Sequence, residues 1–146
     1  MPRCGNMGTG VGMEVEMEIR SLVGGTATVC GPELTLQAAS KVMMEAGIGS
    51  LGVVESGRLV GILTDRDILQ ATAEGADPAY ARVEDWMTPE PDVLAPDVLV
   101  EDAADWLLAT GYRHLPVVEE GELLGVVSIK DVLWALKEPE EQTRSG

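Results

Sequence analysis

The 146-residue sequence contains few aromatic side chains and few cations. Aromatic residues make up 3% of the chain (three Trp, two Tyr and no Phe), which is too few for the stacked platforms on which single-stranded nucleic acids bind. Ten Lys and Arg stand against 25 Asp and Glu, so the formal net charge is -15 with the single His neutral. Such a charge repels phosphate backbones and anionic lipid surfaces. We therefore expect neither a nucleic acid polymer nor a membrane as a partner.

Long apolar runs and a cysteine framework are also absent. No stretch approaches the ~20 apolar residues that a membrane helix requires, and the N-terminus lacks a basic region followed by an apolar one. The two cysteines, Cys4 and Cys30, form no disulfide framework and lack the further ligands that a metal site would need. These absences favour a cytoplasmic protein without a bound metal.

Familiar catalytic motifs are missing too. The sequence contains no His-Glu-x-x-His motif and no Gly-Lys-Ser/Thr phosphate loop. Residues 47–52 are only superficially similar to a nucleophile elbow, because Ile48 occupies a position that requires glycine and Ser50 has no credible triad partner. We expect a protein that is not an enzyme.

An internal repeat dominates what the sequence does contain. The length and a hydrophobic content of 45% suit one average domain or two very small ones. Shifting the chain by 64 residues aligns residues 19–74 with 83–138 without a gap and keeps glycines and apolar positions in step. The sequence therefore predicts two repeats joined by a linker at 75–82. A flexible leader over 1–18 and a disordered tail over 139–146 complete the expected organisation.

Both repeats show the same hydrophobic pattern. A short strand at Val29 or Val93 precedes an amphipathic helix, which covers 36–46 or 100–110 and ends at a glycine. Two apolar strands follow at 51–54 and 59–63, or at 115–118 and 123–127, and a second helix starts at Asp65 or Ile129. The predicted fold class is mixed α/β (α+β), with two pseudo-symmetric β-α-β-β-α units packed through their sheets.

A Gly-x-x-Thr/Ser-x-x-Asp motif ends the second strand of each repeat, at 61–67 and 125–131. One interpretation is a helix cap, in which the hydroxyl and the carboxylate satisfy unpaired backbone N–H groups. The other is a nucleotide site, since a helix N-terminus suits a phosphate and an Asp can accept hydrogen bonds from both ribose hydroxyls. The two interpretations are compatible, and each motif places a cation, Arg66 or Lys130, beside the Asp.

Two further basic side chains, Arg113 and His114, directly precede a predicted strand. A solvated surface charge and a structural imidazole are the alternatives to ligand binding. The first repeat has Gly49 and Ser50 at the equivalent positions, so we expect its phosphate contacts to be weaker and the two sites to be asymmetric.

The two motifs, the segment Val-Glu-Asp-Trp-Met-Thr-Pro at 83–89 and the run Tyr-Arg-His-Leu-Pro-Val-Val at 112–118 resemble the cystathionine β-synthase (CBS) domain family. The resemblance covers nearly all of 19–137, and the ordered set of motifs, present twice at one offset, is specific. It implies a tandem CBS pair, or Bateman module, with two clefts that bind AMP, ADP, ATP or S-adenosylmethionine, and a disc-like homodimer. The Leu-Val-Gly-Gly segment at 22–25 departs from the family pattern.

The resemblance also implies roles for individual residues. Ribose would be bound by Asp67 and Asp131, phosphate or ribose by Thr64 and Ser128, and phosphate by Arg66, Lys130, Arg113 and His114. The base would lie near Val29, Cys30 and Ile48 in one site and near Val93, Leu94 and Tyr112 in the other, with Pro116 among the binding residues. For each apolar residue, ordinary core packing is the alternative.

Two function classes follow from these observations. The first is a regulatory module that senses adenosine-containing ligands and signals to an unidentified partner protein by changing conformation, with no obligatory cofactor and with Mg²⁺ accompanying a triphosphate. The second is a dimerisation or docking module whose clefts are vestigial. The aspartates in both motifs and the nearby cations favour the first.

Overall fold

The computed structural model describes residues 16–24 and 27–137. The predicted tail over 139–146 and the predicted leader over 1–15 lie outside these residues. The elements, in chain order, are a 3₁₀ helix η2 (Ile19–Leu22), β1 (Val29–Cys30), α1 (Leu36–Ala46), β2 (Ser50–Glu55), β3 (Arg58–Thr64), α2 (Asp65–Ala73), α3 (Val83–Trp86), β4 (Thr88–Pro89), α4 (Val100–Thr110), β5 (His114–Glu119), β6 (Glu122–Ser128) and α5 (Ile129–Ala135).

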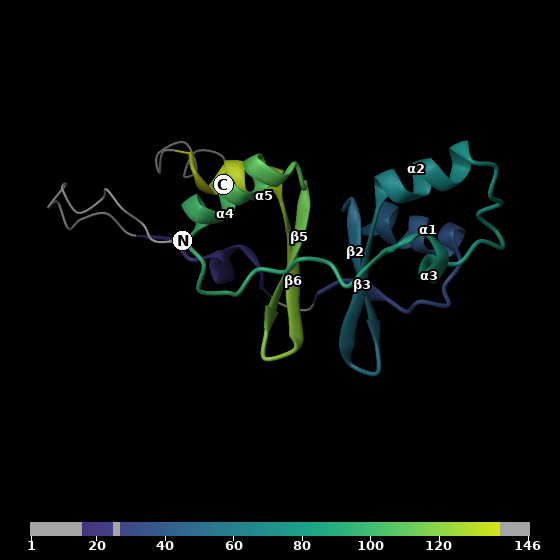
Figure 1. Ribbon diagram of the computed structural model, residues 1–146, viewed down its shortest axis with the longest axis horizontal. Coiled ribbons are helices and arrows are strands. Elements are labelled where there is room, and N and C mark those ends of the chain that lie inside the picture. Colours follow the sequence, from purple (N-terminus) through teal and green to yellow (C-terminus); the bar gives the residue numbers. More distant parts are fainter. Residues whose placement is uncertain (1–15, 25–26, 138–146) are drawn as a thin grey trace, which may run out of the picture.

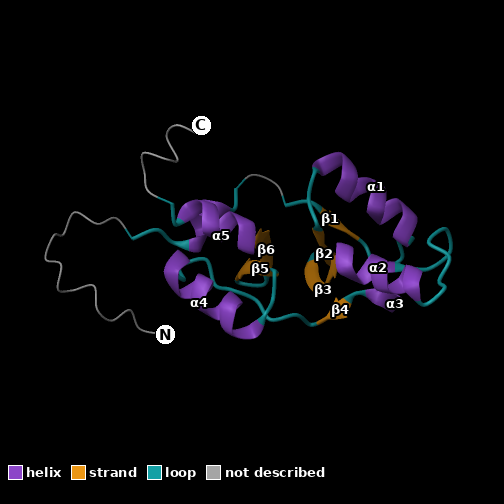
Figure 2. Cartoon of the chain, turned by 90° about the horizontal axis from the view of Figure 1, so that it is seen from above, coloured by secondary structure: helices purple, strands orange, loops and turns teal. Residues whose placement is uncertain are grey.

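Two sheets form the centre of the molecule (Figure 1). The first has the order β1-β2-β3-β4, in which β1 and β2 are parallel and the other pairs are antiparallel. The second is the antiparallel pair β5-β6. Seen from above, the β-hairpins lie side by side, with α1, α2 and α3 outside one and α4 and α5 outside the other (Figure 2). The predicted α+β fold of two units packed through their sheets is confirmed.

The expected strand at Val93 is reduced to a single bridge between Leu94 and Val117. In the first repeat, β1 pairs over two positions, Val29 with Gly52 and Cys30 with Val53. The residue equivalent to Gly52 is Pro116, which has no backbone N–H to donate to a neighbouring strand. The proline therefore removes one hydrogen bond from the second ladder, and the bridge at Leu94 remains.

Each repeat begins with a short segment that docks onto the other repeat. We call residues 17–24 the first arm and residues 81–88 the second arm. The Ile19 N–H donates to the Val98 carbonyl at 2.7 Å, and the equivalent Val83 N–H donates to the Leu34 carbonyl at 2.8 Å. Met17, which the sequence placed in the leader, belongs to the first arm, and its carbonyl accepts from the Val100 N–H at 2.9 Å.

The hydrophobic cores reflect this exchange of arms. One core consists of first-repeat side chains together with Val83 of the second arm. The other consists of second-repeat side chains together with Ile19 of the first arm. Both Ile19 and Val83 are fully buried, so each arm contributes apolar burial to the opposite core. The 3₁₀ helix η2 occupies in the first arm the place that α3 occupies in the second arm. It does so although the Leu-Val-Gly-Gly segment at 22–25 departs from the family pattern.

Glycines allow the two repeats and the first arm to pack closely together. A Cβ on Gly52 of β2 would lie 2.5 Å from Leu123 Cδ2 of β6, where the two repeats meet. A Cβ on Gly125 of β6 would lie 2.8 Å from Val23 Cγ1 and 2.9 Å from Val23 Cβ. The lack of a side chain at Gly125 therefore lets the first arm lie directly on the second sheet.

Replacing Gly125 by alanine is expected to lower the free energy of unfolding by about 1–3 kcal/mol, because Val23 is short and cannot move its Cβ without moving the arm. Urea unfolding measures the effect. Gly24→Ala is the control, since no atom lies within 4 Å of its added methyl group, and its effect should stay within about 0.5 kcal/mol. Equal effects at the two positions would contradict the close packing of the arm.

Candidate functional site

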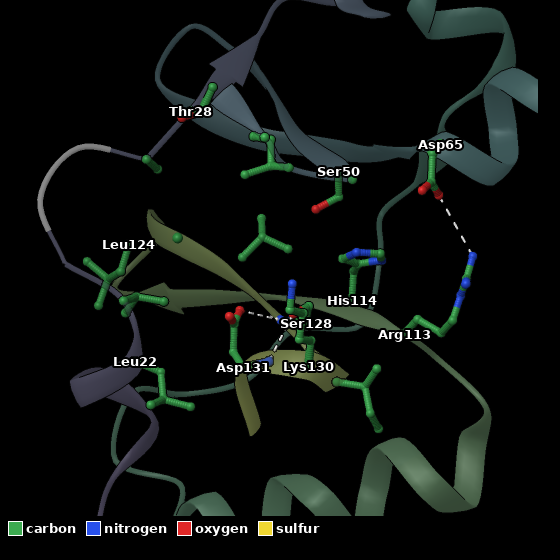
Figure 3. A pocket seen from close by; sticks show the side chains of 18 of the residues that line it. Leu22, Thr28, Ser50, Asp65, Arg113, His114, Leu124, Ser128, Lys130 and Asp131 are labelled. Carbon is green, nitrogen blue, oxygen red and sulfur yellow. Dashed lines mark hydrogen bonds and ion pairs between the residues drawn. The ribbon is translucent and has the colours of Figure 1, made fainter. Parts of the chain in front are cut away.

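A cavity of about 550 Å³ lies where the two repeats meet, and we call it cavity 1. Its walls come from the first arm, from the turn between α1 and β2, and from β6 and the start of α5 (Figure 3). The lining residues are Leu22, Val23, Gly24, Ala27, Thr28, Gly47, Ile48, Gly49, Ser50, Asp65, Arg113, His114, Leu124, Gly125, Val126, Ser128, Ile129, Lys130 and Asp131.

The second Gly-x-x-Ser-x-x-Asp motif supplies one polar wall of cavity 1. Ser128 caps α5: its N–H donates to Asp131 Oδ2 at 2.9 Å, and its Oγ accepts from the Asp131 N–H at 3.1 Å. The capping interpretation is therefore confirmed. Asp131 Oδ1 accepts no hydrogen bond from the described residues, so the exposed side of this carboxylate remains available to a ligand. Lys130, next to it, is exposed.

The opposite wall belongs to the first repeat. Ser50, at the start of β2, is only 6% exposed, and in Figure 3 its hydroxyl points into the cavity toward the second repeat. Ile48 and Thr28 lie on the same side. The motif of one repeat thus faces the turn of the other. Sequence reasoning did not assign Ser50 and Thr28 to the site, although the 64-residue offset places Ser50 at the position of His114.

A second cavity, cavity 2, has a volume of about 320 Å³ and occupies the pseudo-symmetric place. It joins Thr64 and Arg66 of the first motif to the turn that precedes β5 in the second repeat. The Tyr112 hydroxyl donates a hydrogen bond of 2.8 Å to Asp92 Oδ2. The remaining lining residues are Ile62, Thr88, Glu90, Pro91, Gly111, Arg113, His114 and Leu115.

Arg113 and His114 line both cavities. Cavity 1, which contains Gly49 and Ser50, therefore also contains both basic residues of the second repeat. The reason given for weaker phosphate contacts in this cavity, namely the lack of these two residues, does not hold. Arg113 Nη2 lies 3.8 Å from Asp65 Oδ1, an exposed and long ion pair that a ligand phosphate can replace.

His114 has an unusual environment for an imidazole. Burial lowers its pKa below the ordinary value of 6.5, Asp65 raises it, Arg113 lowers it and Asp131 raises it, with burial the largest effect. The imidazole is therefore neutral at pH 7 and can accept or donate a hydrogen bond.

The lowered pKa of His114 predicts a pH-dependent stability. As the pH falls below 6.5, the unfolded chain binds a proton that the folded chain resists, so the free energy of unfolding falls. We expect the wild-type protein to lose more stability between pH 7 and pH 5 than His114→Asn, as measured by urea unfolding. Equal losses, or an NMR titration of His114 at or above 6.5, would contradict the burial effect.

Several predicted site residues line neither cavity. Asp67 is held in the first capping box, where Asp67 Oδ2 accepts from the Thr64 N–H at 2.8 Å and from the Thr64 hydroxyl at 3.1 Å. Val29 and Val93 are partly exposed but lie outside the cavity walls. The contacts predicted for these three residues stay predictions.

Cys30, Leu94 and Pro116 are buried in the protein interior. Cys30 and Leu94 belong to the two hydrophobic cores, and burial raises the pKa of the Cys30 thiol to about 11, so it stays protonated. These three side chains pack as core, which was the alternative for each of them. A ligand contact at these positions is left to the backbone.

Among residues 16–24 and 27–137, no group of three or more His, Cys, Asp or Glu side chains is arranged to hold a metal ion. Over the same residues, no helix has the length and apolar character needed to cross a membrane.

Comparisons with known proteins agree with the fold and the repeat. An uncharacterized 17.7 kDa protein of Acidianus ambivalens is 43% identical over 110 residues, which cover 74% of this chain and 66% of that protein. The CBS domain-containing protein YhcV of Bacillus subtilis is 38% identical over 107 residues, which cover 73% of this chain and 75% of YhcV.

Among solved structures, CBSX2 in complex with AMP has a TM-score of 0.69 and 29% sequence identity, covering 82% of this chain and 95% of CBSX2. The CBS domain model matches residues 19–74 and 83–138, the two stretches that carry the repeat. The resemblance noted in the sequence is thus confirmed, and the chain belongs to the CBS domain family as a tandem pair of CBS domains.

Proposed function

We propose that this protein is a non-catalytic regulatory module that binds an adenosine-containing ligand in cavity 1 and signals to a partner protein. The observation that carries the proposal is the Asp131 carboxylate, which lines cavity 1 together with Lys130 and Arg113 and has one oxygen unused by the described residues. A carboxylate that accepts from two adjacent ribose hydroxyls makes strong, charge-assisted hydrogen bonds.

The charges around Asp131 suit the rest of a nucleotide. Lys130 lies beside the carboxylate, and Arg113, which directly precedes β5, also lines the cavity, where its weak ion pair with Asp65 can give way to a phosphate. Leu22 and Ile48 offer apolar surface to a base. A volume of about 550 Å³ lies within the range of ~300–1,000 Å³ that is typical of small-molecule sites. CBSX2, a relative of similar fold, binds AMP.

The walls of cavity 1 support a signalling role, because they come from both repeats. Asp131 and Lys130 belong to the second repeat, whereas Ile48 and Ser50 belong to the first and Leu22 to the first arm. A ligand that contacts all three parts favours one arrangement of the repeats over others. A partner protein in the cytoplasm with different affinities for these arrangements would then respond to the ligand.

We also propose that two copies pair through their outer helices. Met44 on α1 is 81% exposed and the equivalent Leu108 on α4 is 74% exposed. Leu69 on α2 and its equivalent Leu133 on α5 are 69% and 60% exposed. Apolar side chains at matched positions of both repeats suit a symmetric interface. Analytical ultracentrifugation should give a dimer mass, and Leu69→Glu with Leu133→Glu should give the monomer mass.

Isothermal titration with AMP, ATP (with and without Mg²⁺) and S-adenosylmethionine tests the ligand proposal. We expect at least one of these ligands to release or absorb heat, and at 100 times its Kd to stabilise the fold by about 2.7 kcal/mol. A protein with no heat and no thermal shift for any of the three ligands would instead be a docking module with vestigial clefts.

A further inference from the structure

The two cavities occupy equivalent places but differ at the residues that flank the predicted base slot. The 64-residue offset places Tyr112 of cavity 2 where cavity 1 has Ile48, and Asp92 where cavity 1 has Thr28. The Tyr112 hydroxyl donates to the Asp92 carboxylate at 2.8 Å. An isoleucine side chain has no donor, so Ile48 cannot make this bond with Thr28. The wall of cavity 2 therefore contains a hydrogen bond that cavity 1 lacks.

The difference in volume agrees with this contact. Cavity 1 measures about 550 Å³, whereas cavity 2 measures about 320 Å³, close to the lower limit of ~300 Å³ for small-molecule sites. A base that entered between Tyr112 and Asp92 would have to break a hydrogen bond to a charged group. That cost reduces affinity by about tenfold to a hundredfold.

The basic residues that both cavities share also disfavour a ligand in cavity 2 when cavity 1 is occupied. Arg113 and His114 line both cavities, and His114 is kept neutral by burial. A phosphate bound in cavity 1 would engage the Arg113 guanidinium and bring negative charge to the wall of cavity 2. A second phosphate would then meet an occupied cation and electrostatic repulsion.

We propose that the Tyr112–Asp92 pair excludes the adenine base from cavity 2, so that each chain binds one adenosine ligand, in cavity 1. This inference rests on the proposed function. It makes Tyr112 and Asp92 the residues that determine which of two equivalent cavities is used, and it assigns the stronger site to the cavity that contains Gly49 and Ser50.

The test gives cavity 2 the residues of cavity 1. The double variant Tyr112→Ile and Asp92→Thr changes two exposed residues, so the fold should be retained. Adenosine is the probe, because without a phosphate it does not compete for Arg113. Amide NMR signals locate the binding: Gly47 and Gly49 line cavity 1, and Gly111 lines cavity 2.

In the wild-type protein, adenosine should shift Gly47 and Gly49 and leave Gly111 unchanged, and calorimetry with AMP should give one site per chain. In the double variant, Gly111 should shift as well, at a concentration at least about tenfold lower than any shift in the wild type. Tyr112→Phe keeps the ring and removes the donor, and it should also lower the concentration at which Gly111 shifts.

Three results would overturn the inference. Equal shifts of both glycine sets in the wild type would show that cavity 2 is open. A Gly111 signal that stays unchanged in the double variant would show that something else closes it, and an unchanged response in Tyr112→Phe would remove the role of the hydrogen bond. If neither adenosine nor AMP shifts any of the three glycines in any protein, the proposed function itself fails, and this inference fails with it.

Discussion

Replacing Asp131 by alanine is expected to weaken AMP binding about tenfold to a hundredfold, as measured by calorimetry. The carboxylate lines cavity 1 and keeps one oxygen available for ribose. Its removal takes away hydrogen bonds to a charged acceptor, each worth about 1.5–3 kcal/mol.

The matched control for this prediction is Asp67→Ala. Asp67 makes the same capping box at the start of α2 that Asp131 makes at the start of α5, so both variants should lose about 1 kcal/mol of stability. Asp67 lines neither cavity, and AMP affinity should stay near that of the wild type. Equal losses of affinity in the two variants would mean that the capping boxes act on binding through stability alone.

Replacing Ile19 by alanine is expected to lower the free energy of unfolding by about 2–5 kcal/mol. This side chain is 0% exposed and packs in the second-repeat core with Leu94, Val100 and Leu107. The loss of buried methyl groups leaves a cavity beneath the first arm. Urea unfolding measures the change, and amide exchange of β5 and β6 should accelerate because their core is the one affected.

Ser21→Ala tests whether the Ile19 effect comes from burial. Ser21 is exposed on the same 3₁₀ helix, so its replacement should change the stability by less than about 0.5 kcal/mol. An Ile19→Ala variant as stable as Ser21→Ala would contradict the docking of the first arm onto the second repeat.

The sequence predicts most of the local structure because local structure depends on nearby residues. The apolar spacing in 36–46 and 100–110 is that of helices, and both helices end at glycines with positive φ, Gly47 at 69° and Gly111 at 82°. The Thr/Ser-x-x-Asp motifs form the capping boxes that their spacing indicates. The strand expected at Val93 is reduced to a bridge between Leu94 and Val117, since Pro116 lacks the backbone N–H that the equivalent Gly52 has.

The exchange of the arms could not be predicted from the pattern of either repeat. Ile19 and Val83 occupy equivalent positions, and the two cores that could receive them are built from equivalent residues. Hydrophobic periodicity shows that an arm must be buried but not which of two similar surfaces buries it. The placement of the arms therefore depends on tertiary packing, in which β2 of one repeat contacts β6 of the other.

The composition of each cavity also depends on how the two repeats pack together. The motif with Asp131 shares cavity 1 with Ser50 and Ile48 of the first repeat. Asp67 and Asp131 are indistinguishable in their local motifs, and only the tertiary arrangement places Asp131 on a cavity wall. Tyr112, which lines cavity 2, was assigned to base binding, and its bond to Asp92 depends on residues 20 positions apart.

A crystal structure of the protein grown with AMP tests the central claim most directly. We expect one nucleotide in cavity 1, with its ribose hydroxyls on the Asp131 carboxylate, its phosphate near Lys130 and Arg113, and cavity 2 without a base. A nucleotide bound away from Asp131, or crystals grown in excess AMP that contain no nucleotide, would contradict the account.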